Sequence, residues 1–249
     1  MSKKRVSLTL EEGLVDRIDA EASRNNLNRS QQVEDLLDDY FVSRSIGTAV
    51  VFCGGSEARS MNDYDGKPVL SHVLDNLADT TVERVFLLSG ENRERIESYF
   101  GDVYRGLELV TVSEEDPEGT ARALEIIKDR IAGTFLVLNG HVLSDVDIDE
   151  MLEVHREEDV MASMALTTVN DPSSYGVARL KGRSILGFEE KPSPGEEPSR
   201  LINAGTYIVE PEIFEEIDRD SIEEVFEKLA AERQLAGYIY GGEWKEFPE

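Results

Sequence analysis

The sequence predicts an α/β protein in which a short module of one strand and two helices precedes a larger domain. Three observations support this prediction. From Thr48 onward, short apolar runs alternate with amphipathic helical stretches, which is typical of strands and helices that pack in layers. Glycines follow several of these runs, where tight turns and close backbone approach are needed. Residues 5–10 instead alternate polar and apolar side chains, as in a strand with one buried face.

Composition limits the class of protein. A chain of 249 residues with 40% apolar content can bury the core of one large or two unequal domains. Its net charge of -26 comes from acidic residues scattered along the chain, with few lysines beside the arginines, which is typical of a halophile's solvated surface. The single cysteine, Cys53, excludes an intramolecular disulfide and a cysteine-based zinc cluster. No signal peptide or membrane span is recognisable, so we expect a cytoplasmic protein without a membrane partner.

The charge is distributed unequally between the two parts. Residues 1–46 carry seven basic and nine acidic side chains, so this segment contributes only -2. A strongly acidic domain repels nucleic acid, and any DNA contact must therefore come from the front segment. There Lys3, Lys4 and Arg5 form a basic arm.

The front segment has three expected elements in order. Val6, Leu8 and Leu10 form the apolar face of a strand whose polar face carries Arg5, Ser7 and Thr9. A helix follows over residues 11–25. A second helix begins at Asn28, and Asn28 with Gln31 has the spacing of a capping box.

This order resembles the ribbon-helix-helix family of DNA-binding proteins over residues 3–42, and we assign the module to residues 1–44. The resemblance implies a homodimer whose paired strands enter the major groove of double-stranded DNA. Arg5, Ser7 and Thr9 would then face base edges, and Arg29 and Ser30, at the start of the second helix, would hold a phosphate. The alternative is a segment that serves only for dimerisation.

The larger domain, residues 48–249, alternates expected strands and helices. The expected strands lie at 49–52, 85–88, 107–112, 134–138, 162–168, 177–180 and 202–209. The expected helices lie near 68–77, 93–100, 120–131 and 148–155.

Seven short motifs follow one another along this domain. They are Gly54-Gly55 with Arg59, Gly66-Lys67-Pro68, Gly119-Thr120-Ala121, Leu138-Asn139-Gly140, Tyr175-Gly176-Val177, Glu190-Lys191-Pro192 and Asn203-Ala204-Gly205. In this order they resemble the sugar-1-phosphate nucleotidyltransferase family, over about residues 48–217 and most closely its thymidylyl- and mannose-1-phosphate guanylyltransferases. The resemblance implies a nucleotidyltransferase-type, Rossmann-like (GT-A-like) three-layer domain with a mixed sheet, here shortened at its C-terminal end.

The resemblance also implies ligand-binding residues. Those expected at the phosphates or the nucleotide are Gly54, Gly55, Arg59, Lys67, Gly119 and Thr120. Those expected at the sugar are Gly140, Gly176, Glu190, Lys191 and Asn203. Glu57 and Ala58 stand where the family has glycine and threonine, and the Glu57 carboxylate would repel a triphosphate.

The family's metal positions are altered. His141 stands where the family places an aspartate on magnesium, and neutral imidazole serves this hard cation poorly. Glu246, after Trp244, occupies the context of the second metal aspartate. Asp145 and Asp147 are possible substitutes, although acidic residues before a helix more often cap it. No catalytic residue is assigned, and Mg²⁺ is expected as a cofactor only if the domain is an active enzyme.

Three functions are consistent with these features. The first is a dimeric transcription regulator whose catalytically inactive domain senses a sugar phosphate, nucleotide sugar or nucleotide. The alternative is an active Mg²⁺-dependent sugar-1-phosphate nucleotidyltransferase with a dimerising or autoregulatory front module. The third is an assembly protein that uses the large domain as a partner surface.

Overall fold

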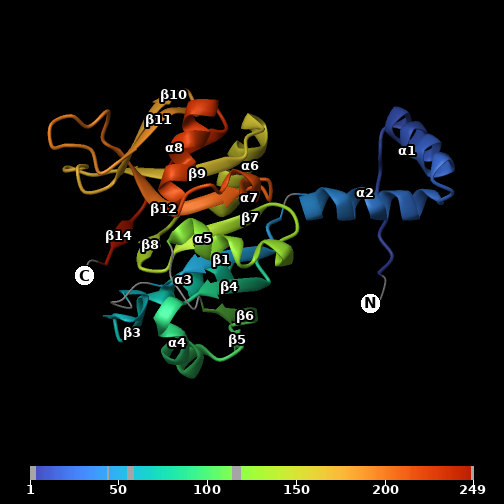
Figure 1. Cartoon of the computed structure of the whole chain (residues 1–249). Coiled ribbons are helices and arrows are strands. Elements are labelled where there is room, and N and C mark those ends of the chain that lie inside the picture. Colours follow the sequence, from blue (N-terminus) through green and yellow to red (C-terminus); the bar gives the residue numbers. More distant parts are fainter. Residues whose placement is uncertain (1–3, 44, 55–58, 114–118, 248–249) are drawn as a thin grey trace. The chain divides into compact units, whose positions relative to one another are not determined.

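The chain divides into two compact units, residues 1–45 and 46–249, in the computed structural model (Figure 1). The structure describes residues 4–43, 45–54, 59–113 and 119–247. Lys3, Gly55, Glu57 and Ala58, to which the sequence assigns roles, therefore lie outside the described residues.

The front unit contains the two expected helices, α1 (Glu12–Arg24) and α2 (Arg29–Ser43). The capping box is confirmed: the Asn28 side chain accepts from the Gln31 backbone N–H, and the Gln31 side chain accepts from the Asn28 N–H, both at 3.0 Å. Arg29 joins the helices through two hydrogen bonds to Asp19, at 2.7 and 2.6 Å. This pairing lowers the pKa of the Asp19 carboxyl.

The expected strand at the front of this unit is absent from the single chain. Residues 4–10 have no regular secondary structure, and Val6 and Leu8 are 71% and 63% exposed instead of packed on the helices. A strand is stable only when a neighbour satisfies its backbone hydrogen bonds, and the described part of one chain supplies none here. The helical stripe is also only partly buried: Ile18 and Ala22 are covered, whereas Leu14 is 43% exposed.

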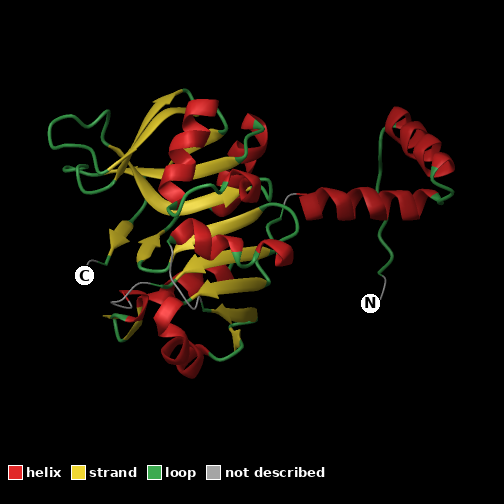
Figure 2. Ribbon diagram, in the orientation of Figure 1, coloured by secondary structure: helices red, strands yellow, loops and turns green. Residues whose placement is uncertain are grey.

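A mixed sheet organises the large unit (Figure 2). In spatial order its ten strands are β10 (Gly176–Lys181), β11 (Ser184–Glu190), β13 (Leu235–Ile239), β9 (Ala162–Thr168), β12 (Leu201–Val209), β7 (Phe135–Asn139), β1 (Thr48–Phe52), β4 (Arg84–Leu88), β6 (Leu107–Val112) and β5 (Val103–Tyr104). Strands β7, β1, β4 and β6 are parallel, and β12 runs antiparallel between β7 and β9. The predicted mixed sheet is thus confirmed.

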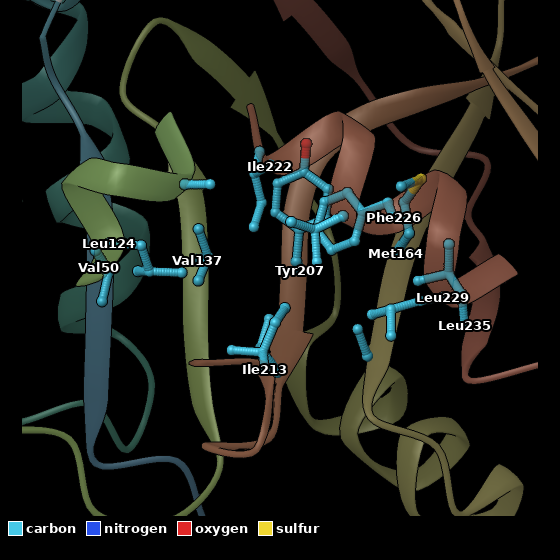
Figure 3. Close-up of a cluster of buried hydrophobic side chains, with 14 of the residues drawn as sticks. Val50, Leu124, Val137, Met164, Tyr207, Ile213, Ile222, Phe226, Leu229 and Leu235 are labelled. Carbon is cyan, nitrogen blue, oxygen red and sulfur yellow. The ribbon is translucent and has the colours of Figure 1, made fainter. Parts of the chain in front are cut away.

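Helices cover both faces of this sheet and make three layers. On one face lie α3 (Val69–Ala78), α4 (Arg93–Phe100) and α6 (Ile148–Glu158); on the other lie α5 (Thr120–Glu125), α7 (Ile213–Glu216) and α8 (Ile222–Glu232). Strand alternation divides the core: Ala49 and Val51 pack on the first face, Val50 and Phe52 on the second. Figure 3 shows the second cluster, where Tyr207 of β12 meets Phe226 of α8.

Two small pairings complete the unit. Strand β14 (Trp244–Glu246) pairs antiparallel with β8 (Val142–Ser144), and β2 (Asp63–Tyr64) pairs with β3 (Lys67–Pro68). The expected helix at 120–131 is shorter, because α5 ends at Glu125 and a separate 3₁₀ turn spans Lys128–Arg130. No helix among the described residues combines the length and apolarity that a membrane crossing requires.

Candidate ligand-binding site

A cavity of about 520 Å³ opens where several strands of the large unit end. Gly54, Gly90 and His141 line it. Each of them lies two residues beyond the carboxyl end of a parallel strand, β1, β4 and β7 respectively. Strand β12 contributes Asn203, and β14 contributes Glu246. Ligands of open α/β sheets bind at this edge, where loops leave the strands.

Most of the described residues that the sequence assigns to phosphate or nucleotide line this cavity. Gly54 and Arg59 reach it from the end of β1, and Gly119 and Thr120 reach it from the start of α5. Lys67 does not lie in this cavity. It forms an ion pair with Asp75 of α3 beside a separate surface depression, and Arg105 binds the same carboxylate at 3.0 Å.

Gly119 and Thr120 also attach α5 to the segment before α8. The Ala121 N–H donates to the Asp220 carbonyl at 2.9 Å, and the Ile222 N–H donates to the Thr120 hydroxyl at 2.9 Å. Gly119 has φ +115°, and a Cβ there would lie 2.3 Å from the Asp220 carbonyl oxygen. Glycine is required at this position because both the backbone conformation and the neighbouring chain exclude a side chain.

The residues assigned to the sugar also line the cavity, with one exception. Gly176 of β10 faces Glu190 of β11 in register, and a Cβ on Gly176 would lie 2.7 Å from a Glu190 oxygen. Gly140 is buried and does not line the cavity, and a Cβ there would lie 2.9 Å from the Phe52 carbonyl oxygen, so this glycine allows strands to pack closely. Lys191 and Asn203 both line the cavity.

Neighbouring groups set the orientation of the Asn203 amide and the pKa of the Glu190 carboxyl. The Asn203 amide donates to the Tyr207 hydroxyl at 2.6 Å and accepts from the Gly205 N–H at 2.9 Å, which fixes its orientation. Burial, and then repulsion from Glu223, raises the pKa of the Glu190 carboxyl. Glu190 also lies 3.8 Å from the Lys191 ammonium.

The two altered metal positions contact each other. His141 Nε2 lies 3.4 Å from Glu246 Oε1, and an Arg59 guanidinium nitrogen lies 3.7 Å from the same oxygen. The interaction with His141 holds the pKa of Glu246 below its usual range against the effect of burial, and the charges of Arg59 and Lys191 add to it. Glu246 is therefore an ionised carboxylate that lies between His141 and the Arg59 guanidinium.

This donor set does not fit the magnesium ion that the family resemblance implies. Mg²⁺ selects oxygen ligands, and His141 offers a nitrogen while the Glu246 carboxylate is already paired with the Arg59 guanidinium. The proposed substitutes lie elsewhere. Asp147 caps α6 by accepting from the Glu150 N–H at 2.9 Å, and Asp145 lines a different depression. Among the described residues, no three His, Cys, Asp or Glu side chains are grouped to hold a metal.

Several lining residues, among them Tyr175, Trp244 and Glu223, were not assigned to the site from sequence. Tyr175 and Trp244 meet edge to face, with ring centroids 5.4 Å apart, and the Trp244 indole N–H donates to the Ala204 carbonyl at 3.2 Å. Glu223 enters from the first turn of α8, a helix absent from the expected elements. The tryptophan and tyrosine did stand within motifs noted in the sequence, and that position was the available signal.

The residues assigned to DNA are accessible in the front unit. Lys4, Arg5, Ser7 and Thr9 are exposed along the irregular segment, and Ser30 is exposed at the start of α2. Arg29 is 56% exposed but is paired with Asp19, so the Asp19 carboxylate would compete with a DNA phosphate for it.

Known proteins resemble the large unit in sequence and in fold. The Nucleotidyl transferase family model matches residues 58–246. Bifunctional protein GlmU of Methanococcus vannielii is 31% identical over 221 residues, 80% of this chain and 51% of that protein. Mannose-1-phosphate guanylyltransferase 1 of Arabidopsis thaliana is 33% identical over 196 residues, 74% of this chain and 54% of that protein. The chain thus spans about half the length of the curated relatives it matches.

Solved structures show the same fold. UDP-glucose pyrophosphorylase from Acinetobacter baumanii superimposes with a TM-score of 0.69 at 18% identity, over 81% of this chain and 88% of that chain. A UDP-glucose pyrophosphorylase complexed with UDP-glucose superimposes with a TM-score of 0.69 at 19% identity, over 80% of this chain and 92% of that chain. Because the family model spans well over half of the sequence, the chain belongs to the nucleotidyl transferase family.

Proposed function

We propose that the cavity binds a sugar 1-phosphate or a nucleotide sugar. The observation that carries the proposal is convergence: four separate segments of the sequence bring Arg59, Gly176, the pair Glu190 and Lys191, and Asn203 to one cavity. Arg59 and Lys191 supply charge for a phosphate, while Glu190 and Asn203 supply hydrogen-bonding groups for sugar hydroxyls. The Tyr175 and Trp244 rings offer flat apolar surface to a sugar or base.

The reaction we propose for this site is the one that the relatives' names indicate, nucleotidyl transfer. A sugar phosphate oxygen would attack the α-phosphorus of a nucleoside triphosphate, the bond to the β-phosphate would break, and pyrophosphate would leave. Such catalysis consists mainly of positioning and charge neutralisation. The described residues can position a sugar phosphate, but they do not form a magnesium site, and no step of the proposed reaction is assigned to a metal ion.

Equilibrium binding separates ligand recognition from catalysis. We expect mannose 1-phosphate and UDP-glucose to bind the full chain in isothermal titration calorimetry, and Asn203→Ala to weaken both by ~10-fold, as for one lost hydrogen bond to a sugar. Lys67→Ala is the matched control, because Lys67 lies outside the cavity, and it should leave both affinities unchanged. Absence of binding by the wild type, or equal loss in both variants, would refute the proposal.

Pyrophosphate release then decides between an enzyme and a sensor. Release from a nucleoside triphosphate that depends on added mannose 1-phosphate and is lost in Asn203→Ala would establish the transfer reaction. Ligand binding without release would establish a binding protein that retains the family's cavity.

A second candidate, a DNA-binding homodimer that responds to this ligand, is favoured by a specific observation in the front unit. Val6, Leu8 and Leu10 alternate along one segment and are 71%, 63% and 39% exposed. Regularly spaced exposed apolar side chains are costly in water and would be covered if two such segments paired as strands. The exposed Arg5, Ser7 and Thr9 would then form the opposite, DNA-facing side.

Two variants on opposite faces of this segment test the candidate. Leu8→Ser should convert a dimer to monomers in sedimentation analysis, whereas Thr9→Ala should not. Arg5→Ala should cost ~1–3 kcal/mol of sequence-specific DNA affinity if Arg5 pairs with a guanine. A wild-type monomer at micromolar concentration, or DNA affinity that is unchanged in Arg5→Ala, would contradict this candidate.

A further inference from the structure

We propose that Glu246 is a built-in counter-anion of the cavity, which a ligand phosphate must displace from Arg59 and His141, and that this binding needs no metal ion. The inference rests on the proposed function, since it assigns the phosphate end of the same cavity. It concerns what has replaced the family's metal site in this chain.

The fold holds the Glu246 carboxylate in place. Glu246 pairs with Val142 in the β14–β8 register, and the next residue, Phe247, donates its N–H to the His141 carbonyl at 3.0 Å. The Phe247 ring in turn packs edge to face on Tyr64, at 4.8 Å between centroids. Backbone pairing and aromatic packing thus fix the chain at Glu246, whose carboxylate lies 3.4 Å from His141 and 3.7 Å from Arg59.

Charge around the cavity makes this contact important for binding. Among the described lining residues, Arg59 and Lys191 are the permanent cations, and Glu190, Glu223 and Glu246 are the carboxylates. Lys191 lies near Glu190, and Arg59 lies near Glu246. An incoming phosphate therefore meets an arginine that is already neutralised, and its net gain is an exchange of one anion for another.

The exchange predicts that removing the Glu246 charge strengthens phosphate binding. Glu246→Gln keeps the side-chain shape and should bind mannose 1-phosphate ~10-fold more tightly than the wild type, a gain of ~1.4 kcal/mol. Glu243→Gln removes an equal charge from the exposed position three residues earlier and should change the affinity little. A metal-ligand role for Glu246 predicts the opposite: weaker binding in Glu246→Gln, and loss of wild-type binding when EDTA replaces Mg²⁺.

The titration uses calorimetry on the full chain with mannose 1-phosphate, in EDTA and in Mg²⁺. Tighter binding by Glu246→Gln in both buffers, and no gain when Arg59→Ala is added, would support the inference. Equal or weaker binding by Glu246→Gln, with measurable wild-type affinity, would overturn it and leave the proposed function standing. Absence of binding by the wild type and every variant would instead overturn the proposed function, and the inference with it.

A second variant guards against misfolding of Glu246→Gln. Glu246→Asp keeps the charge but withdraws it by one methylene, so its affinity should lie between those of the wild type and Glu246→Gln. An affinity at or below the wild type would count against displacement. Thermal unfolding of each variant shows whether the large unit remains folded.

Discussion

Replacing Gly119 by alanine tests the junction on which the cavity depends. Two costs arise independently. The backbone conformation there, φ +115° and ψ 171°, is essentially restricted to glycine, and alanine would carry ~1–3 kcal/mol of strain. The added Cβ would also lie 2.3 Å from the Asp220 carbonyl oxygen, a backbone atom that moves only with its chain, and overpacking of this kind costs ~1–3 kcal/mol.

Together these costs remove ~2–6 kcal/mol from a domain whose total stability is of order 5–15 kcal/mol. At ~2–4 °C per kcal/mol for a domain of this size, the Tm should fall by ~4–24 °C in a thermal scan followed by circular dichroism. Gly133→Ala is the matched control, because φ there is +81° but no atom lies within 4 Å of the added Cβ. It should show the strain alone. Equal losses of Tm in the two variants would refute the steric argument. No loss of Tm in either variant would refute the steric argument and the strain argument together.

Two further predictions concern contacts that support the site and the core. His155 and Thr134 hydrogen-bond to Glu210, which lowers the pKa of that carboxyl, so the stability it provides is present above its ordinary pKa of 4.5 and is lost as the pH falls below it. Chemical denaturation from pH 6 to about 3 should therefore give a shallower fall in unfolding free energy for Glu210→Gln than for the wild type, and parallel curves would contradict this. Tyr207→Phe leaves the Asn203 amide without its 2.6 Å partner and should cost ~1–2 kcal/mol of stability with weaker UDP-glucose binding; unchanged affinity would show that the hydroxyl does not position Asn203.

Much of the large unit could be predicted from the sequence because its central strands are buried on both faces. β1, β4 and β7 are continuous apolar runs followed by polar or glycine residues, and such runs indicate the strands of a covered sheet. The last part of the unit was harder. β13 and β14 are short, and their partners β9 and β8 are distant in the sequence, so periodicity alone does not show the pairing. The helix α8, which precedes β13 in the sequence, was also missed.

In the front unit, a feature that depends on neighbouring residues in the sequence was predicted correctly, whereas one that depends on a second strand was not. The capping box at Asn28 is a local signal and was predicted with its partner. The strand at residues 5–10 depends on a neighbour that the described chain does not contain, so alternation alone did not establish it. The homodimer and the DNA contact remain predictions that this segment motivates.

The sequence predicted the site where its motifs lie at strand ends. It did not predict which side chains form ion pairs and hydrogen bonds with each other. Gly176, Glu190 and Asn203 reach one cavity because their strands lie close together in the sheet. Lys67 shares the motif order but pairs with Asp75 away from the cavity, and only the three-dimensional structure shows this preference. The resemblance placed His141 and Glu246 at the two metal positions of one site, but their direct contact with each other is visible only in the structure.

The most direct test of the central claim uses the chain's single tryptophan, Trp244, which lines the cavity. UDP-glucose is titrated into the wild type and Asn203→Ala, with tryptophan fluorescence and calorimetry recorded on the same samples. We predict a saturable fluorescence change in the wild type whose dissociation constant agrees with the calorimetric one, and a weaker constant by both methods in Asn203→Ala. Calorimetric binding that leaves Trp244 fluorescence unchanged and is unaffected by Asn203→Ala would place the ligand elsewhere, and no heat at all would contradict a nucleotide-sugar site.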